Sequence, residues 1–69
     1  MEKYEYDGQV VNKFGQIISY KFKAYTMADS EKKARSNFLY QYKKSNGLAL
    51  TTKIDLPGKI KLSKGDIYG

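Results

Sequence analysis

Two segments near the start of the chain alternate between apolar and polar residues with a period of two. The first, residues 3–12, puts a set of largely apolar residues on one side: Tyr4, Tyr6, Gly8 and Val10. The second resumes after Gly15 and does the same with Ile18, Tyr20, Phe22 and Ala24. Such alternation is typical of half-buried strands. The loop between them suits a tight turn with Gly15 at a positive φ, so the sequence predicts a β-hairpin.

The period changes after Thr26. An apolar stripe then recurs every four residues, at Ala34, Phe38 and Tyr42, which indicates a helix with one buried side. Asp29 or Ser30 suits the N-terminal cap. Gly47 suits the left-handed conformation that commonly ends a helix. The sequence therefore predicts a helix from about residue 30 to residue 45.

Alternation returns in residues 53–62, where one side holds Ile54, Leu56, Gly58, Ile60 and Leu62. Pro57 has no N–H to donate, which predicts an edge strand or a bulge at Pro57–Gly58. A right-handed return through the helix brings this strand beside the first one. The predicted fold is α+β, in the order β-β-α-β. Its three-stranded antiparallel sheet has the order 2-1-3, the helix packs on one face, and no element covers the other.

Length and composition bound the class of protein. The chain of 69 residues predicts a single small domain in residues 1–62, followed by a flexible tail in residues 63–69. It contains no Cys and no His, so we expect no disulfide, no metal site and no cofactor. The N-terminal residues do not resemble a signal peptide, and no apolar run is long enough to cross a bilayer. We expect a cytoplasmic protein with no membrane partner.

Charge points to an anionic partner. Thirteen Lys and Arg against seven Asp and Glu give a net charge of +6, and such an excess attracts phosphates without regard to sequence. Enzymatic signals are absent, because the sequence has no phosphate-binding loop and no nucleophile motif. Glu5 and Asp7 are the only carboxylates that share a side of one element, and a flat strand offers no cleft to separate their pKa values. We therefore expect a binding module and not an enzyme.

The uncovered sheet face is one candidate site. The second and third strands bring to it the basic and aromatic residues Lys21, Lys23, Tyr25, Lys53, Lys59 and Lys61. Basic sheets with aromatic residues are common in single-strand and RNA binders. The first strand, however, lies between them and carries Glu5 and Asp7. The alternative interpretation is that these acids form cross-strand ion pairs with the lysines and need no ligand.

The helix is the other candidate site. Its residues off the apolar stripe are Lys32, Lys33, Arg35, Ser36, Tyr40, Lys43 and Lys44. An ordinary solvated helix face is the alternative interpretation, although interspersed Glu would be expected if the lysines served only in pairs along the helix. Because Arg35 is the only arginine, the lysines favour contact with the nucleic-acid backbone over the reading of bases.

The alternating and helical patterns predict which of the seven tyrosines lie in the core and which are exposed. Those predicted to lie in the core are Tyr4, Tyr6, Tyr20 and Tyr42, with their hydroxyls at its rim. Tyr25 and Tyr40 are predicted on exposed faces, and Tyr68 in the tail. Exposed tyrosines beside lysines suit base stacking and protein interfaces equally well.

Residues 4–42 loosely resemble the arm-type DNA-binding domain of tyrosine recombinases from mobile elements. The resemblance rests on Lys21–Thr26, a basic strand that leads into the helix at Ser30–Ala34. It implies a sheet that enters the major groove of DNA. In that family all three strands precede the helix, whereas here the third strand follows it. The whole chain is also similar to short basic proteins of phages and conjugative elements of Gram-positive bacteria.

Two functions follow as hypotheses. The first is a non-enzymatic module that binds nucleic acid with weak specificity through its lysine-rich faces. The second is a protein-interaction module, such as an accessory factor of a phage or mobile element that docks on a partner protein. In addition, the exposed edge of the second strand could pair with another copy of the chain and form a dimer.

Overall fold

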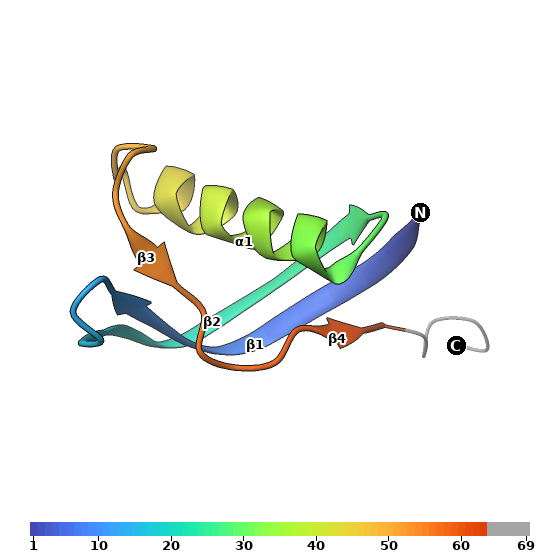
Figure 1. Ribbon diagram of the computed structural model, residues 1–69, viewed down its shortest axis with the longest axis horizontal. Coiled ribbons are helices and arrows are strands. Elements are labelled where there is room, and N and C mark those ends of the chain that lie inside the picture. Colours follow the sequence, from blue (N-terminus) through green and yellow to red (C-terminus); the bar gives the residue numbers. More distant parts are fainter. Residues whose placement is uncertain (64–69) are drawn as a thin grey trace.

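The computed structural model describes residues 1–63 and has two layers, a sheet and one helix. Its elements are β1 (Glu2–Asn12), β2 (Ile17–Ala28), α1 (Glu31–Ser45), β3 (Ile54–Asp55) and β4 (Lys61–Leu62). The strands are antiparallel in the order β2-β1-β3, and β4 also pairs with β1. α1 lies across one face of this sheet (Figure 1). The predicted α+β fold, its strand order and the single-sided helix are confirmed.

The turn between β1 and β2 is held by one side chain. The Asn12 carboxamide oxygen accepts hydrogen bonds from the backbone N–H groups of Phe14 and Gln16, at 2.9 and 3.0 Å. Gly15 has a φ of 82°, which L-residues with a side chain rarely adopt. The hairpin and the role of Gly15 are therefore as predicted.

The pairing of β2 with β1 is regular up to Gly8 and irregular beyond it. Register shifts occur on both sides of Val10, which pairs with Ser19. At these shifts β2 has more residues than β1, as in a β-bulge, and the side chains of β2 that follow Phe22 toward the turn change sides of the sheet. Tyr20 is consequently 73% exposed and Ile18 is exposed as well. The prediction that Tyr20 and Ile18 continue the core face was wrong, because it assumed an unbroken period of two.

Helix α1 has the limits that its sequence predicts. The Ser30 hydroxyl accepts a hydrogen bond from the Lys33 N–H at 3.2 Å, which makes Ser30 the N-cap. At the other end Gly47 has a φ of 67°. The buried residues of the helix are those of the predicted stripe: Ala34, Phe38 and Tyr42.

The third strand is interrupted in its middle. β3 and β4 pair with β1 at its two ends, for example Val11 with Asp55 and Glu5 with Lys61. Between them the chain leaves the ladder around Pro57, where the sequence predicted an edge strand or a bulge. Leu56 and Ile60 stay buried beneath α1.

The Tyr6 hydroxyl occupies this interruption. It donates a hydrogen bond to the Gln9 carbonyl at 2.6 Å and accepts one from the Gly58 N–H at 3.1 Å. A Cβ atom added at Gly8 or at Gly58 would lie 3.0 Å from the hydroxyl oxygen. Both glycines therefore leave the room that the side chain of Tyr6 needs.

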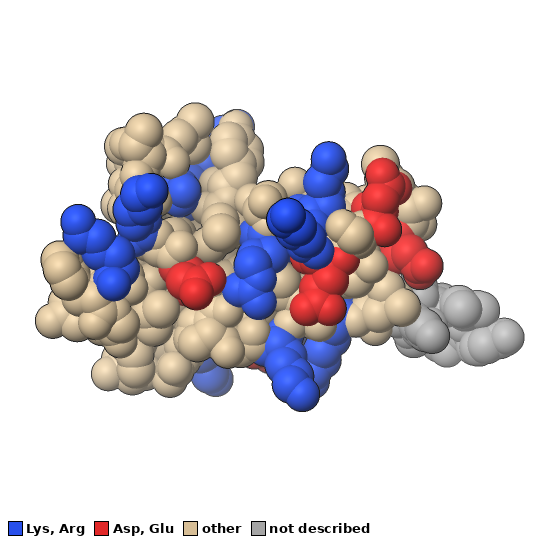
Figure 2. Space-filling view, in the orientation of Figure 1, with Lys and Arg blue, Asp and Glu red and all other residues tan. Residues whose placement is uncertain are grey.

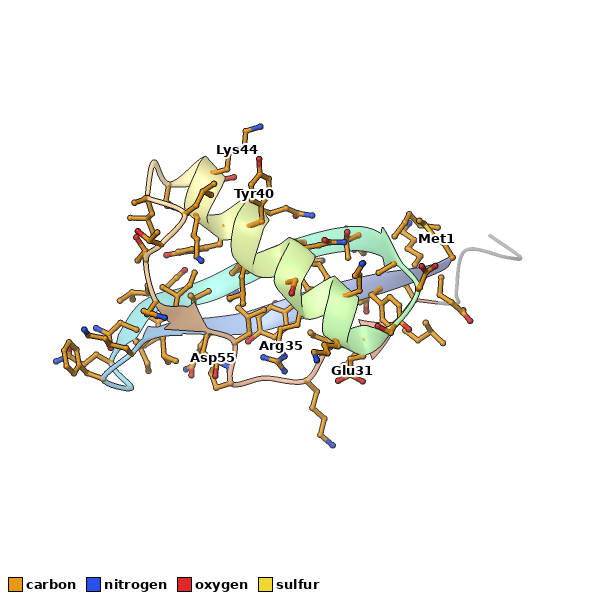
Figure 3. All side chains as sticks on the ribbon, turned by 45° about the horizontal axis from the view of Figure 1, so that its top comes forward. Met1, Glu31, Arg35, Tyr40, Lys44 and Asp55 are labelled. Carbon is orange, nitrogen blue, oxygen red and sulfur yellow. The ribbon has the colours of Figure 1, made fainter. Side chains whose placement is uncertain are left out.

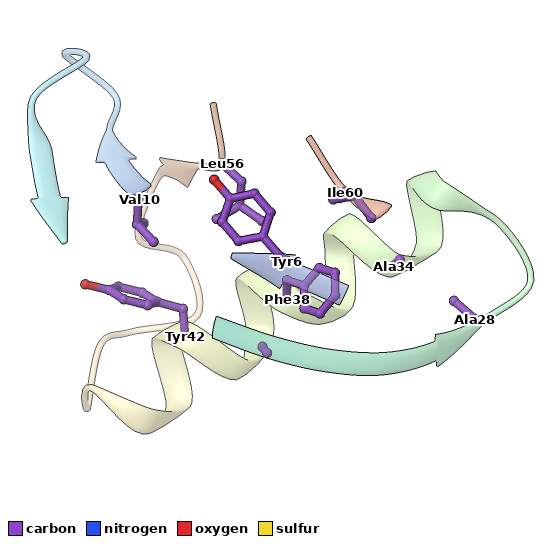
Figure 4. Close-up of a cluster of buried hydrophobic side chains, with 9 residues drawn as sticks. Tyr6, Val10, Ala28, Ala34, Phe38, Tyr42, Leu56 and Ile60 are labelled. Atoms are coloured by element: carbon purple, nitrogen blue, oxygen red, sulfur yellow. The ribbon is translucent and has the colours of Figure 1, made fainter. Parts of the chain in front are cut away.

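The ring of Tyr6 is also the centre of the core. It is fully buried, and its centroid lies 6.1 Å from that of Phe38 in α1 and 6.2 Å from that of Phe22 in β2. Figure 4 shows it beside Phe38 and Leu56. One side chain thus joins the helix, the hairpin and the segment between β3 and β4.

The predicted tail begins at Ser63, which lies just beyond β4 and still bonds to β1. Its N–H donates a hydrogen bond to the Lys3 carbonyl at 2.8 Å. The remainder of the predicted tail, with Tyr68, lies outside the described residues.

Replacing Tyr6 with Phe tests the importance of the hydroxyl. The change leaves the Gly58 N–H and the Gln9 carbonyl without their partner in a partly buried place. We expect the free energy of unfolding to fall by roughly 1–3 kcal/mol, measured by urea denaturation. Tyr20→Phe is the matched control and should change it by less than about 0.5 kcal/mol. Equal effects of the two changes would contradict this account.

Candidate nucleic-acid interface

Two amide side chains of α1 form hydrogen bonds that hold the helix against the edge strand β2. The Asn37 amide donates to the Thr26 hydroxyl at 3.0 Å, and the Gln41 amide donates to the Tyr25 carbonyl at 3.3 Å. These bonds fix which side of α1 faces the sheet. They also occupy part of the outer edge of β2.

On the opposite side of α1, Arg35 forms hydrogen bonds to the third strand. Its guanidinium donates to the Leu56 carbonyl at 2.7 Å and to the Asp55 carboxylate at 3.2 Å. Its side chain is 34% exposed, against 68% for Asp55. Arg35 was a candidate for binding nucleic acid, and the structure gives it a role within the fold (Figure 3).

The outward side of α1 carries most of the helix candidates. This basic helix surface consists of Lys32, Lys33, Ser36, Tyr40, Lys43 and Lys44. With about 100° between successive residues, these positions lie opposite the buried stripe. From Lys32 to Ser45 the helix contains no acidic residue. No carboxylate of α1 beyond its first residue therefore competes with a bound anion.

Tyr40 lies near the middle of the basic helix surface. It is 49% exposed, and the Lys44 ammonium group lies 5.9 Å from the centre of its ring. Both side chains point away from the sheet in Figure 3. Lys43 is more restrained, since its ammonium group donates to the Leu50 carbonyl at 3.0 Å. The surface thus offers an accessible aromatic ring among lysine ammonium groups.

The sheet face turned away from α1 forms a second basic surface, the open sheet face. Its paired positions are Lys3, Glu5 and Asp7 of β1, Lys23, Tyr25 and Met27 of β2, and Lys61 of β4. The candidates Lys21 and Lys59 are exposed beside them, next to the inward-facing Phe22 and Ile60. Lys53 is exposed just before β3, off the paired part of the sheet.

Lys3 was missed among the predicted site residues. Its ammonium group lies 5.1 Å from the centre of the Tyr25 ring. The alternation of Lys3 with Glu5 and Asp7 was the signal that could have placed it on the same face.

The acids of the open sheet face lie beside lysines without forming salt bridges to them. Asp7 pairs with Lys23 in the ladder, and Glu5 with Lys61. Across residues 1–63, however, the salt bridge that forms is Arg35–Asp55. The predicted neighbours are confirmed, but the predicted ion pairs are not formed. The reason is geometric, because a shared ladder position does not by itself bring two flexible charged ends together.

The hairpin end carries a hydrophobic surface of its own. Its exposed large side chains, here called the hairpin patch, are Phe14, Ile17, Ile18 and Tyr20. The register shifts of β2 expose Ile18 and Tyr20. This patch was not predicted, because regular alternation assigned Ile18 and Tyr20 to the core.

Three kinds of site are not found in the described part of the chain. Residues 1–63 enclose no pocket and hold no cluster of acidic side chains suited to a metal ion. None of their helices is long and apolar enough to cross a membrane. Comparison with protein-family models, with curated proteins and with solved structures found no match to this chain.

Two variants, Arg35→Gln and Asp55→Asn, test how much each hydrogen bond of Arg35 contributes to stability. Arg35→Gln removes a charged donor from a partly buried carbonyl, so we expect the free energy of unfolding to fall by roughly 1–3 kcal/mol. Asp55→Asn keeps an oxygen that can accept from the Leu56 N–H, as the carboxylate does at 2.8 Å, and weakens an exposed ion pair, so it should cost less than about 1 kcal/mol. Thermal and urea unfolding of both variants measure the difference. A larger loss for Asp55→Asn would show that the ion pair, and not the bond to Leu56, holds this flank.

Proposed function

We propose that the protein is a non-enzymatic binding module that contacts the phosphate backbone of nucleic acid through the basic helix surface. The observation that carries the proposal is the one-sided charge of α1. Its lysines face outward without an intervening carboxylate, while Arg35, Asn37 and Gln41 bind the sheet. The cytoplasm is the compartment in which this activity would take place.

The spacing of the lysines suits a duplex that lies along α1. The pairs Lys32–Lys33 and Lys43–Lys44 stand at the two ends of the helix, about 16 Å apart at 1.5 Å per residue. A duplex of that length carries roughly nine phosphate charges. Several lysines can therefore meet phosphates at the same time.

Weak sequence specificity follows from the kind of side chain. Lysine is a flexible point charge, whereas bidentate recognition of guanine depends on the planar fork of arginine. The one arginine of the chain bonds to Leu56 and Asp55. Contacts from lysine position a protein on the backbone and carry no direct sequence information.

The hairpin patch favours a second candidate function, binding to a protein. Phe14 and Tyr20 are each more than 70% exposed at one end of the molecule, and exposed aromatic residues are enriched at protein interfaces. This would suit an accessory protein of a phage or mobile element. Stoichiometric capture of one partner that is unaffected by nuclease and is lost in Phe14→Ser would support it.

Dimer formation through the edge of β2 has less support than the sequence suggested. Amides of α1 already bond to the Tyr25 and Met27 carbonyls on this edge. The other half of the strand carries register shifts and exposed lysines. Bulges and edge lysines are features by which proteins avoid pairing between sheet edges.

Salt dependence tests the proposed function. Fluorescence anisotropy with labelled duplex and single-stranded oligonucleotides should show binding that weakens linearly with salt on a log–log plot, by about 0.9 per phosphate contact on a duplex. The triple variant K32Q/K33Q/K44Q should flatten the slope by two to three units and lower the affinity at least tenfold at low salt.

The matched control is K13Q/K53Q/K59Q, which removes the same charge from exposed positions away from α1. It should retain most of the affinity. Equal losses in the two triple variants would indicate diffuse attraction instead of a site. Absence of binding even at low salt would contradict the proposed function altogether.

A further inference from the structure

We infer that the protein has two nucleic-acid-binding surfaces on opposite sides and bridges two separate segments of nucleic acid. The basic helix surface holds one segment and the open sheet face holds the other. The inference rests on the proposed function and extends it from one contact to two.

The two-layer architecture sets the direction of the surfaces. α1 covers one face of the sheet, and the second face has no layer over it within residues 1–63 (Figure 1). Lys and Arg side chains emerge both above α1 and below the sheet in Figure 2. The Cα atoms extend 40 × 20 × 18 Å, so the body that separates the surfaces is about as thick as a duplex is wide.

The open sheet face has a surplus of positive charge. Lys3, Lys23 and Lys61 occupy ladder positions on it, with Lys21 and Lys59 beside them, against the two carboxylates of Glu5 and Asp7. None of these lysines forms a salt bridge within residues 1–63. Their ammonium groups therefore remain available to phosphates.

The two surfaces have the same chemistry. On the helix, a lysine lies over the half-exposed ring of Tyr40. On the sheet, Lys3 lies over Tyr25, which is also half exposed. A tyrosine ring beside an ammonium group can pack against a sugar or base while the cation meets the phosphate.

One short duplex cannot reach both surfaces. They face away from each other across a packed core, and DNA is stiff over about 150 base pairs. A short duplex bound to α1 therefore leaves the open sheet face available for a second one. Glu5 and Asp7 should make this second contact the weaker of the two.

A capture experiment measures bridging directly. A duplex of about 20 base pairs, too short to bend around the protein, is fixed to beads, and a labelled duplex of the same length stays in solution. Added protein should retain the labelled duplex on the beads at low salt. Retention should fall again at high protein concentration, where separate molecules fill the duplexes singly.

The sheet variant K3Q/K23Q/K61Q distinguishes a bivalent monomer from a dimer that bridges. It should bind a single duplex with less than about a threefold loss of affinity, since the helix contacts that set the salt slope remain. Its capture of the second duplex should fall at least tenfold. Undiminished capture by this variant would overturn the inference, because a dimer that binds through α1 alone would then be the bridge.

Two further variants complete the test. E5Q/D7N raises the charge of the open sheet face and should increase capture, a gain that loss of folding cannot produce. K13Q/K53Q, at exposed positions that belong to neither surface, should capture as well as the unaltered protein, and a loss equal to that of the sheet variant would also overturn the inference. If the unaltered protein binds one duplex without capturing another, the bridging inference fails alone. If it binds none, the proposed function fails with it.

Discussion

The Tyr6 hydroxyl is the constraint on which the rest of the structure depends. Between β3 and β4 the backbone of the third strand leaves the ladder with β1. There the Tyr6 hydroxyl bonds to Gly58 and Gln9 instead. The ring beneath it packs against Phe22 and Phe38. The break in the sheet, the position of α1 and the centre of the core are therefore set together by one side chain.

The single core between α1 and the sheet also determines where the charges lie. The buried residues all belong to one contiguous cluster between α1 and the sheet, and a chain of 69 residues has little apolar surface left for a third layer. The opposite sheet face is consequently exposed and carries polar residues. The outer side of α1 is polar for the same reason. A two-layer fold with a single core thus produces two basic surfaces that face in opposite directions.

The sequence could predict the elements whose signals are local. Ser30 and Gly47 mark the ends of α1, and Pro57 marks the break in the third strand, because each acts through its own backbone. The exposure of Tyr20 could not be predicted, since register shifts depend on how two strands meet. Gly58, which bonds to Tyr6, and Leu56, which bonds to Arg35, lie 52 and 21 residues from these partners in the sequence, and no periodic pattern contains such contacts. The sequence also divided the candidate lysines between the uncovered sheet face and the helix, and all of them except the partly buried Lys43 are exposed.

The central claim is that these two surfaces, and not the hairpin patch, meet nucleic acid. An NMR titration of the labelled protein with a short duplex tests it most directly. We expect the amide signals of Lys32, Lys33 and Lys44 to shift first and those of Lys23 and Tyr25 to follow as more duplex is added. Shifts confined to the turn and the hairpin patch, or of equal size in every element, would contradict it.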